Sequence, residues 1–140
     1  NLDAERLIRE NRWQAEIVSG SSRTYNSHGY SFQVSLGGPA IHLGPAALNT
    51  YLTDGSYTKV RPSEVRPGDI VMFGETGGPH GWHTGVVTDR PGWCVSKWGD
   101  GPLVRHQVSE GPYGEVIGHY RNTVLAMKRL APPQKLRISW

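Results

Sequence analysis

The sequence has 140 residues, which suits a single domain with one hydrophobic core. Hydrophobic residues make up 36% and charged residues 19%, values typical of a globular chain and not of a disordered one. The formal net charge is only +3, and the sequence contains no nucleic-acid-binding motif and no run of about 18 apolar residues. We therefore expect neither a nucleic-acid partner nor a membrane span.

Three helices are expected in the first part of the chain. The first covers residues 2–18 and is capped by Asp3, and we expect it to end or bend at Asn11 and Arg12, where polar residues weaken the apolar pattern. The second covers residues 27–36, with Tyr30 facing inward, and the third covers residues 45–52 and begins with a proline. Eighteen glycines and ten prolines in the whole chain limit the helical content.

Short extended segments, bounded by turns that contain Gly and Pro, follow in the rest of the chain. They cover residues 57–60, 70–73, 83–87, 93–98, 103–108, 116–121 and 124–130. Several short strands at close spacing predict an antiparallel sheet or half-barrel, and helices followed by a sheet predict the α+β class. We expect one domain over residues 1–131 and a C-terminal tail over residues 132–140.

His83 opens one of these strands directly after a glycine-rich loop. On residue type alone, an ordinary histidine at a strand end is the simpler interpretation. However, two motifs stand in order here: Arg-Pro-Gly-Asp-Ile-Val-Met-Phe at residues 66–73 and His-Thr-Gly-Val-Val at residues 83–87. Together they resemble the core of the NlpC/P60 and CHAP families of papain-like cysteine hydrolases. The resemblance implies that these two strands pair, that N-terminal helices pack on the sheet, and that His83 is the general base.

The same families place their nucleophilic cysteine at the start of an upstream helix, where the helix N-terminus lowers the pKa of the thiol. Tyr-Asn-Ser-His-Gly-Tyr at residues 25–30 resembles that helix start, with Ser27 at the cysteine position. Three interpretations of Ser27 stay open: a Cys→Ser change that silences the enzyme, a natural serine nucleophile, or a plain helix N-cap. The serine nucleophile is chemically disfavoured because a hydroxyl needs stronger base assistance than a thiol.

The resemblance implies further members of the site. The backbone N–H of residue 27 would form most of the oxyanion hole, with Tyr25 or Asn26 as an additional side-chain donor. Ser96, on the strand that follows the histidine strand, takes the position of the polar residue that orients the base.

His28, Trp82 and Trp98 are expected to border the cleft of this site. Strand alternation places Cys94, Ser96 and Trp98 on one face of their strand. Cys94 is the only cysteine, so no internal disulfide is expected, and its position in the middle of a strand indicates a buried and inert thiol. The histidines lack the spacing of a zinc site, and we expect neither a metal nor a cofactor.

The resemblance implies a cysteine-dependent amide-bond hydrolase, a peptidase or amidase, whose substrate is a peptide or a peptidoglycan stem peptide. Because the sequence does not begin with methionine, it is interpreted as a piece of a longer polypeptide. One form of this hypothesis is a C-terminal effector or toxin domain that is secreted or delivered and has an immunity or inhibitor protein as partner. Two alternatives stay open: a catalytically inactive peptide- or glycan-binding module with a native Ser27, and a deamidase or acyltransferase that acts on a protein.

Overall fold

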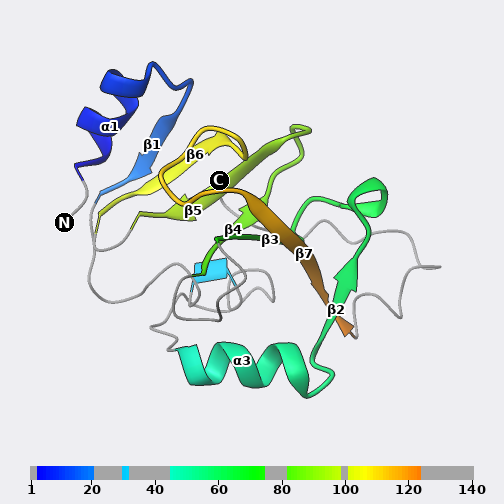
Figure 1. Ribbon diagram of the computed structural model, residues 1–140. Coiled ribbons are helices and arrows are strands. Elements are labelled where there is room, and N and C mark those ends of the chain that lie inside the picture. Colours follow the sequence, from blue (N-terminus) through cyan, green and yellow to red (C-terminus); the bar gives the residue numbers. More distant parts are fainter. Residues whose placement is uncertain (1–2, 21–29, 32–44, 75–81, 99–100, 124–140) are drawn as a thin grey trace.

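The computed structural model describes residues 3–20, 30–31, 45–74, 82–98 and 101–123 (Figure 1). The elements in chain order are α1 (Ala4–Asn11), β1 (Glu16–Ser19), α3 (Pro45–Thr53), β2 (Tyr57–Val60), the short 3-10 helix η1 (Pro62–Glu64), β3 (Ile70–Phe73), β4 (His83–Val87), β5 (Trp93–Lys97), β6 (Leu103–Gln107) and β7 (Val116–Asn122). Short helices and a larger sheet confirm the predicted α+β class.

The seven described strands form one sheet in the order β1-β6-β5-β4-β3-β7-β2. Every neighbouring pair is antiparallel, which confirms the predicted antiparallel sheet. The strands β2, β3 and β4 begin and end at the predicted residues. The strands β5, β6 and β7 begin at the predicted residues, and the last residue of each differs from the prediction by one position. The limits of β3 are sharp because Gly68 and Gly74 flank it with φ values of 90° and 134°, which favour glycine.

Of the predicted helix over residues 2–18, the part up to Asn11 is helical, and the helix ends at the break expected at Asn11 and Arg12. The helix α1 ends there because Arg12 adopts the left-handed conformation with φ 55°. The chain then forms β1, which pairs with β6 so that Glu16 lies opposite Arg105, and an ion pair of 2.9 Å joins these two side chains. After the end of α1, pairing with a distant strand therefore makes the chain extended.

The other helix predictions hold where the structure describes them. Asp3 caps α1 as predicted, since its carboxylate accepts a backbone N–H of the first turn at 3.1 Å. The helix α3 matches the third predicted helix with one additional residue at its end. Of the predicted helix over residues 27–36, Tyr30 and Ser31 are described, and both are helical and buried. The rest of that helix, the predicted strand over residues 124–130 and the C-terminal tail lie outside the described residues.

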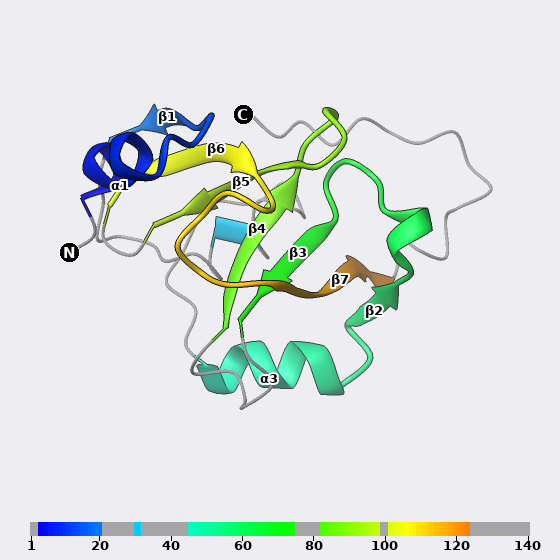
Figure 2. The same cartoon turned by 45° about the horizontal axis from the view of Figure 1, so that its top comes forward.

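One face of the sheet packs against the helix α3. Ile70 and Met72 of β3 pack with Tyr57 of β2, and α3 contributes Tyr51 and Leu52 to the same cluster. Figures 1 and 2 both show α3 beside the part of the sheet that contains β2, β3 and β7.

The opposite face is covered by α1 and by the connection between β6 and β7. Phe73 belongs to this face because alternate residues of β3 point to opposite sides, and it packs with Cys94 of β5. Trp98 and Val104 pack with Ala4 of α1. Figure 2 shows α1 over the end of the sheet that contains β1 and β6. Both faces of β3, β4 and β5 are therefore buried.

Asp69, the last residue of the Arg-Pro-Gly-Asp motif, fixes the turn before β3. Its carboxylate accepts the backbone N–H of Arg66 at 2.8 Å and two N–H groups of the Arg121 guanidinium, each at 2.7 Å. Asp69 is only 3% exposed, and Arg121 lies on β7. This buried ion pair joins the turn to a neighbouring strand, which gives the acidic residue of the motif a structural role.

Candidate functional site

His83 is the first residue of β4 and lies opposite Phe73, the last residue of β3. The predicted pairing of the two motif-bearing strands is therefore confirmed. His83 is 5% exposed. Its imidazole stacks on the ring of Tyr113, with centroids 3.4 Å apart and planes 8° apart, while the Phe73 ring lies 6.0 Å away. Aromatic side chains from β3 and from the β6–β7 connection thus enclose the predicted base.

The predicted nucleophile position lies outside the described residues. This applies to Ser27 and to its neighbours Tyr25, Asn26 and His28. Their roles as nucleophile, oxyanion-hole donors and cleft residue stay predictions, and the geometry that the structure describes is that around His83.

Ser96 lies on β5 directly opposite Gly85. Gly85 is on β4, two residues after His83. Gly85 suits this close approach, because a Cβ there would meet the carbonyl oxygen of Val95 at 3.0 Å and the Cβ of Ser96 at 3.2 Å, tighter than an ordinary contact. The hydroxyl of Ser96 takes part in two buried hydrogen bonds, at 2.7 Å with Nε2 of His106 and at 3.1 Å with Nε1 of Trp98. The residue predicted to orient His83 is thus hydrogen-bonded to a different histidine.

The chemistry of the donors fixes the direction of these bonds. The indole N–H of Trp98 can only donate, so Oγ of Ser96 accepts it. Nδ1 of His106 lies 2.7 Å from the carbonyl oxygen of Gln107 and therefore carries the ring proton. The Ser96 hydroxyl then donates to Nε2 of His106, and a continuous chain of hydrogen bonds runs from Trp98 to the backbone of Gln107.

Cys94 completes this buried polar network. Its Sγ lies 3.5 Å from Nε2 of His106, which confirms that Cys94 and Ser96 share one face of β5. Burial lowers the pKa of His106, although Gln107 and Glu110 oppose this effect, so the imidazole is neutral at pH 7. Burial raises the pKa of the fully buried Cys94 thiol, which is therefore protonated. The predicted burial of Cys94 is confirmed.

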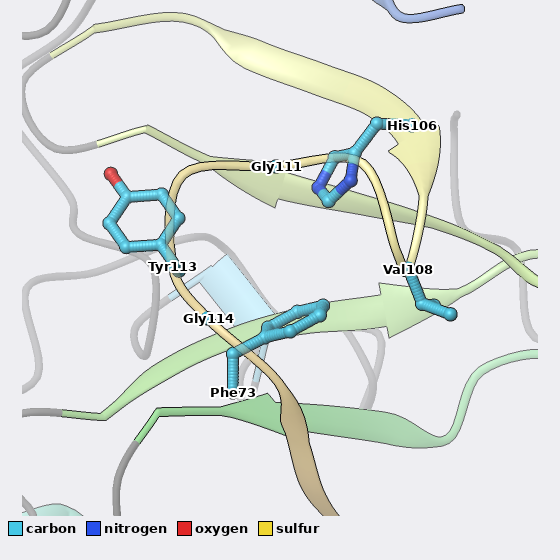
Figure 3. A pocket seen from close by; sticks show the side chains of 6 residues that line it. All are labelled: Phe73, His106, Val108, Gly111, Tyr113 and Gly114. Atoms are coloured by element: carbon cyan, nitrogen blue, oxygen red, sulfur yellow. The ribbon is translucent and has the colours of Figure 1, made fainter. Parts of the chain in front are cut away.

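A small hollow lies beside His106, between the sheet and the β6–β7 connection. It is lined by Phe73, His106, Val108, Gly111, Tyr113 and Gly114 (Figure 3). It has no room for a water molecule. Gly111 approaches the imidazole so closely that a Cβ at this position would meet Cε1 of His106 at 3.2 Å. The hollow is therefore a packing gap and not a binding pocket.

Trp82 and Trp98, which were both expected to border the cleft, belong to different clusters. Trp82 packs with Ile70 and Met72 on the side of α3. Trp98 is fully buried and packs with Ala4 of α1. The expectation that both shape one groove is therefore corrected, because they pack on opposite faces of the sheet.

Sequence reasoning missed two residues: Tyr113, which stacks on His83, and His106, which is hydrogen-bonded to Ser96. Alternation along β5 had placed Cys94 on one face, and the pairing of β5 with β6 sets His106 opposite it. The sequence alone does not give the register in which β5 pairs with β6, and only this register shows that His106 lies on the same face of the sheet as Cys94. Tyr113 lies in a loop, where periodicity in the sequence carries no information.

Comparisons with known proteins found no relative: no family model, no curated protein and no solved structure matches the chain. Within the described residues, no three His, Cys, Asp or Glu side chains are grouped closely enough to hold a metal ion. None of the helices described is both long enough and apolar enough to cross a membrane. The case for a function therefore depends on the geometry around His83.

Proposed function

We propose that this chain is the inactive Cys→Ser form of an amide-bond hydrolase of the papain-like NlpC/P60–CHAP type, with His83 as general base and Ser27 at the position of the nucleophilic cysteine. The observation that carries the proposal is the pairing of β3 with β4. It brings the strand after the Arg-Pro-Gly-Asp motif against the strand that opens with His83, with Phe73 directly opposite. Each motif is a weak signal by itself, and their antiparallel pairing is what the family resemblance requires.

In this proposal, a cysteine at position 27 gives its proton to His83, and the thiolate attacks the carbonyl carbon of an amide. The C–N bond breaks as the imidazolium protonates the leaving nitrogen, which leaves a thioester on the cysteine. The imidazole then takes a proton from water, which attacks the thioester, and the thiol leaves as the carboxylate product forms. Because a hydroxyl gives up its proton far less readily, we expect the chain with Ser27 to be inactive.

The substrate of first choice is a peptide, and in particular a stem peptide of peptidoglycan. A deamidase or an acyltransferase would use the same thioester and would differ in the leaving group or in the group that accepts the acyl chain. An effector or toxin role, with an immunity or inhibitor protein as partner, would require that the active form damages cells.

The test is the Ser27→Cys variant, assayed for release of peptides and new amino groups from purified peptidoglycan and from synthetic peptide amides. We expect hydrolysis by this variant and none by the chain with Ser27. The control is the double variant Ser27→Cys/His83→Ala, which should be slower by on the order of 100-fold or more. Lack of hydrolysis by Ser27→Cys, or activity that is indifferent to His83, would contradict the proposal.

The burial of His83 favours a second candidate, a catalytically inactive module that binds a peptide or a glycan. A base that works on a large substrate needs an accessible edge, and His83 is 5% exposed in this structure. Binding of stem peptides or glycans by the chain with Ser27, measured by titration calorimetry, together with an inactive Ser27→Cys variant, would support this candidate. Absence of binding in that measurement would exclude it.

A further inference from the structure

The stack of His83 on Tyr113 is the closest ring contact among the described residues. The centroids are 3.4 Å apart, and the planes are parallel within 8°. The other aromatic neighbour, Phe73, lies 6.0 Å from the imidazole with its plane inclined by 39°. The phenol ring of Tyr113 therefore covers one face of the imidazole, and Phe73 packs against it at an angle.

Tyr113 belongs to the connection between β6 and β7, and both ends of this connection are anchored. Backbone hydrogen bonds of 2.9 Å and 3.0 Å tie its ends to the turn before β5 and to the residue after β3. Gly114, directly after Tyr113, has φ 85°, a conformation that favours glycine. The backbone that carries Tyr113 is thus positioned by contacts other than the stack itself.

The middle of the same connection rests on the sheet. Gly111 lies against the imidazole of His106, and this histidine is fixed by its bonds to Ser96 and Gln107. The side chain of Tyr113 packs against both clusters on this face of the sheet, the one around Phe73 and the one around Trp98. Figure 3 shows the connection running past His106 at Gly111 and then past Tyr113 and Gly114 toward Phe73.

We propose that Tyr113 is a positioning residue for His83, which holds the plane of the imidazole so that the ring edge faces the reacting groups. This inference rests on the proposed role of His83 as general base. The outer torsion of a histidine side chain is only loosely defined by itself, so a base that must align with a thiol needs neighbours that fix its ring plane. A stacked phenol does this without occupying the edge that carries both ring nitrogens.

The first experiment is NMR spectroscopy of the whole chain with Ser27, which requires no activity. Because a stacked phenol shields its neighbour, the ring protons of His83 should resonate upfield of those of a histidine in an unstructured peptide. Tyr113→Phe keeps a ring in place and should preserve this shift, whereas Tyr113→Leu should abolish it. Tyr51→Leu is the matched control, since it removes a partly buried tyrosine from the opposite face of the sheet.

Unshifted His83 protons in the starting protein, or the same shift in Tyr113→Leu, would overturn the inference. Circular dichroism checks that each variant is folded. If Tyr113→Leu does not fold, Tyr113→Met, whose unbranched and flexible side chain can adapt to the space left by the ring, replaces it with the same expected result.

The second experiment uses the Ser27→Cys background and separates kcat from KM. Tyr113→Leu should lower kcat by on the order of tenfold to 100-fold with little change in KM, because a misaligned base affects the chemical step. Tyr113→Phe should restore kcat, and Tyr51→Leu should leave both constants unchanged. An unchanged kcat in Tyr113→Leu would overturn the positioning role. If Ser27→Cys itself is inactive, the proposed function fails, whereas the NMR comparison still decides whether Tyr113 fixes the imidazole.

Discussion

Ser96 shows how a single hydroxyl can organise a buried polar region. Its oxygen accepts the indole N–H of Trp98, and its hydroxyl donates to Nε2 of His106. Both of these buried nitrogens are therefore hydrogen-bonded. All three side chains are at most 2% exposed. In such a setting, the loss of one bonding partner is costly because the remaining groups stay desolvated.

We expect Ser96→Ala to reduce the free energy of unfolding by about 1–3 kcal/mol, because it removes two buried hydrogen bonds at once. The matched control is Thr58→Ala, which removes an exposed hydroxyl that bonds to Thr123 at 3.1 Å. This control should change stability by no more than about 0.5 kcal/mol. Urea unfolding followed by tryptophan fluorescence measures both values, and equal effects of the two changes would contradict the assigned network.

Asp69 links elements, since it joins the turn before β3 to Arg121 on β7. Both side chains are largely buried, at 4% and 12% exposure. We expect Asp69→Asn to destabilise the chain by about 3 kcal/mol, because it leaves the guanidinium partly buried without its charge partner. Denaturant unfolding measures this loss.

The chain provides a matched control for that prediction in the exposed ion pair between Glu16 and Arg105. This pair links β1 to β6 at 2.9 Å, with side chains 67% and 28% exposed. Glu16→Gln should therefore change stability by less than about 1 kcal/mol. A similar loss in both variants would show that burial does not set the strength of these pairs.

His106 makes the junction of β5, β6 and their neighbouring loop sensitive to acid. Burial lowers the pKa of its imidazole, opposed by Gln107 and Glu110, while an unfolded chain has a histidine pKa of about 6.5. Above that pH both states are neutral, and below it the unfolded state binds more protons. Stability should therefore fall as the pH drops below about 6.5.

Urea unfolding at pH 7.5 and at pH 5 tests this sign. His106→Gln should flatten the dependence of stability on pH. His119→Gln provides the comparison, because burial also lowers the pKa of the half-buried His119, against the opposing effect of Asp69. We expect the larger flattening from His106, which is only 2% exposed. An unchanged pH dependence in His106→Gln would contradict the prediction.

At the scale of the whole molecule, the central sheet was the most predictable part. The limits of β3 and β4 followed from the sequence because glycine-rich turns bound short apolar runs, and the motifs predicted their pairing. The end of α1 near Asn11 was foreseeable from the polar residues there, but the strand β1 was not, since residues 16–19 become extended through pairing with the distant strand β6. The candidate site was predictable as far as His83. Its aromatic enclosure by Tyr113 comes from a loop, whose path depends on contacts between distant elements.

The proposed function requires that a thiol at position 27 can exchange a proton with the His83 imidazole. Alkylation of the Ser27→Cys variant by iodoacetamide as a function of pH tests this requirement without knowledge of the substrate. The starting protein is the control, because its only cysteine, Cys94, is fully buried. We predict that the thiol at position 27 reacts with a midpoint below the ordinary pKa of about 8.5 and that His83→Ala shifts this midpoint upward. A midpoint near 8.5 that is the same with and without His83 would contradict the account.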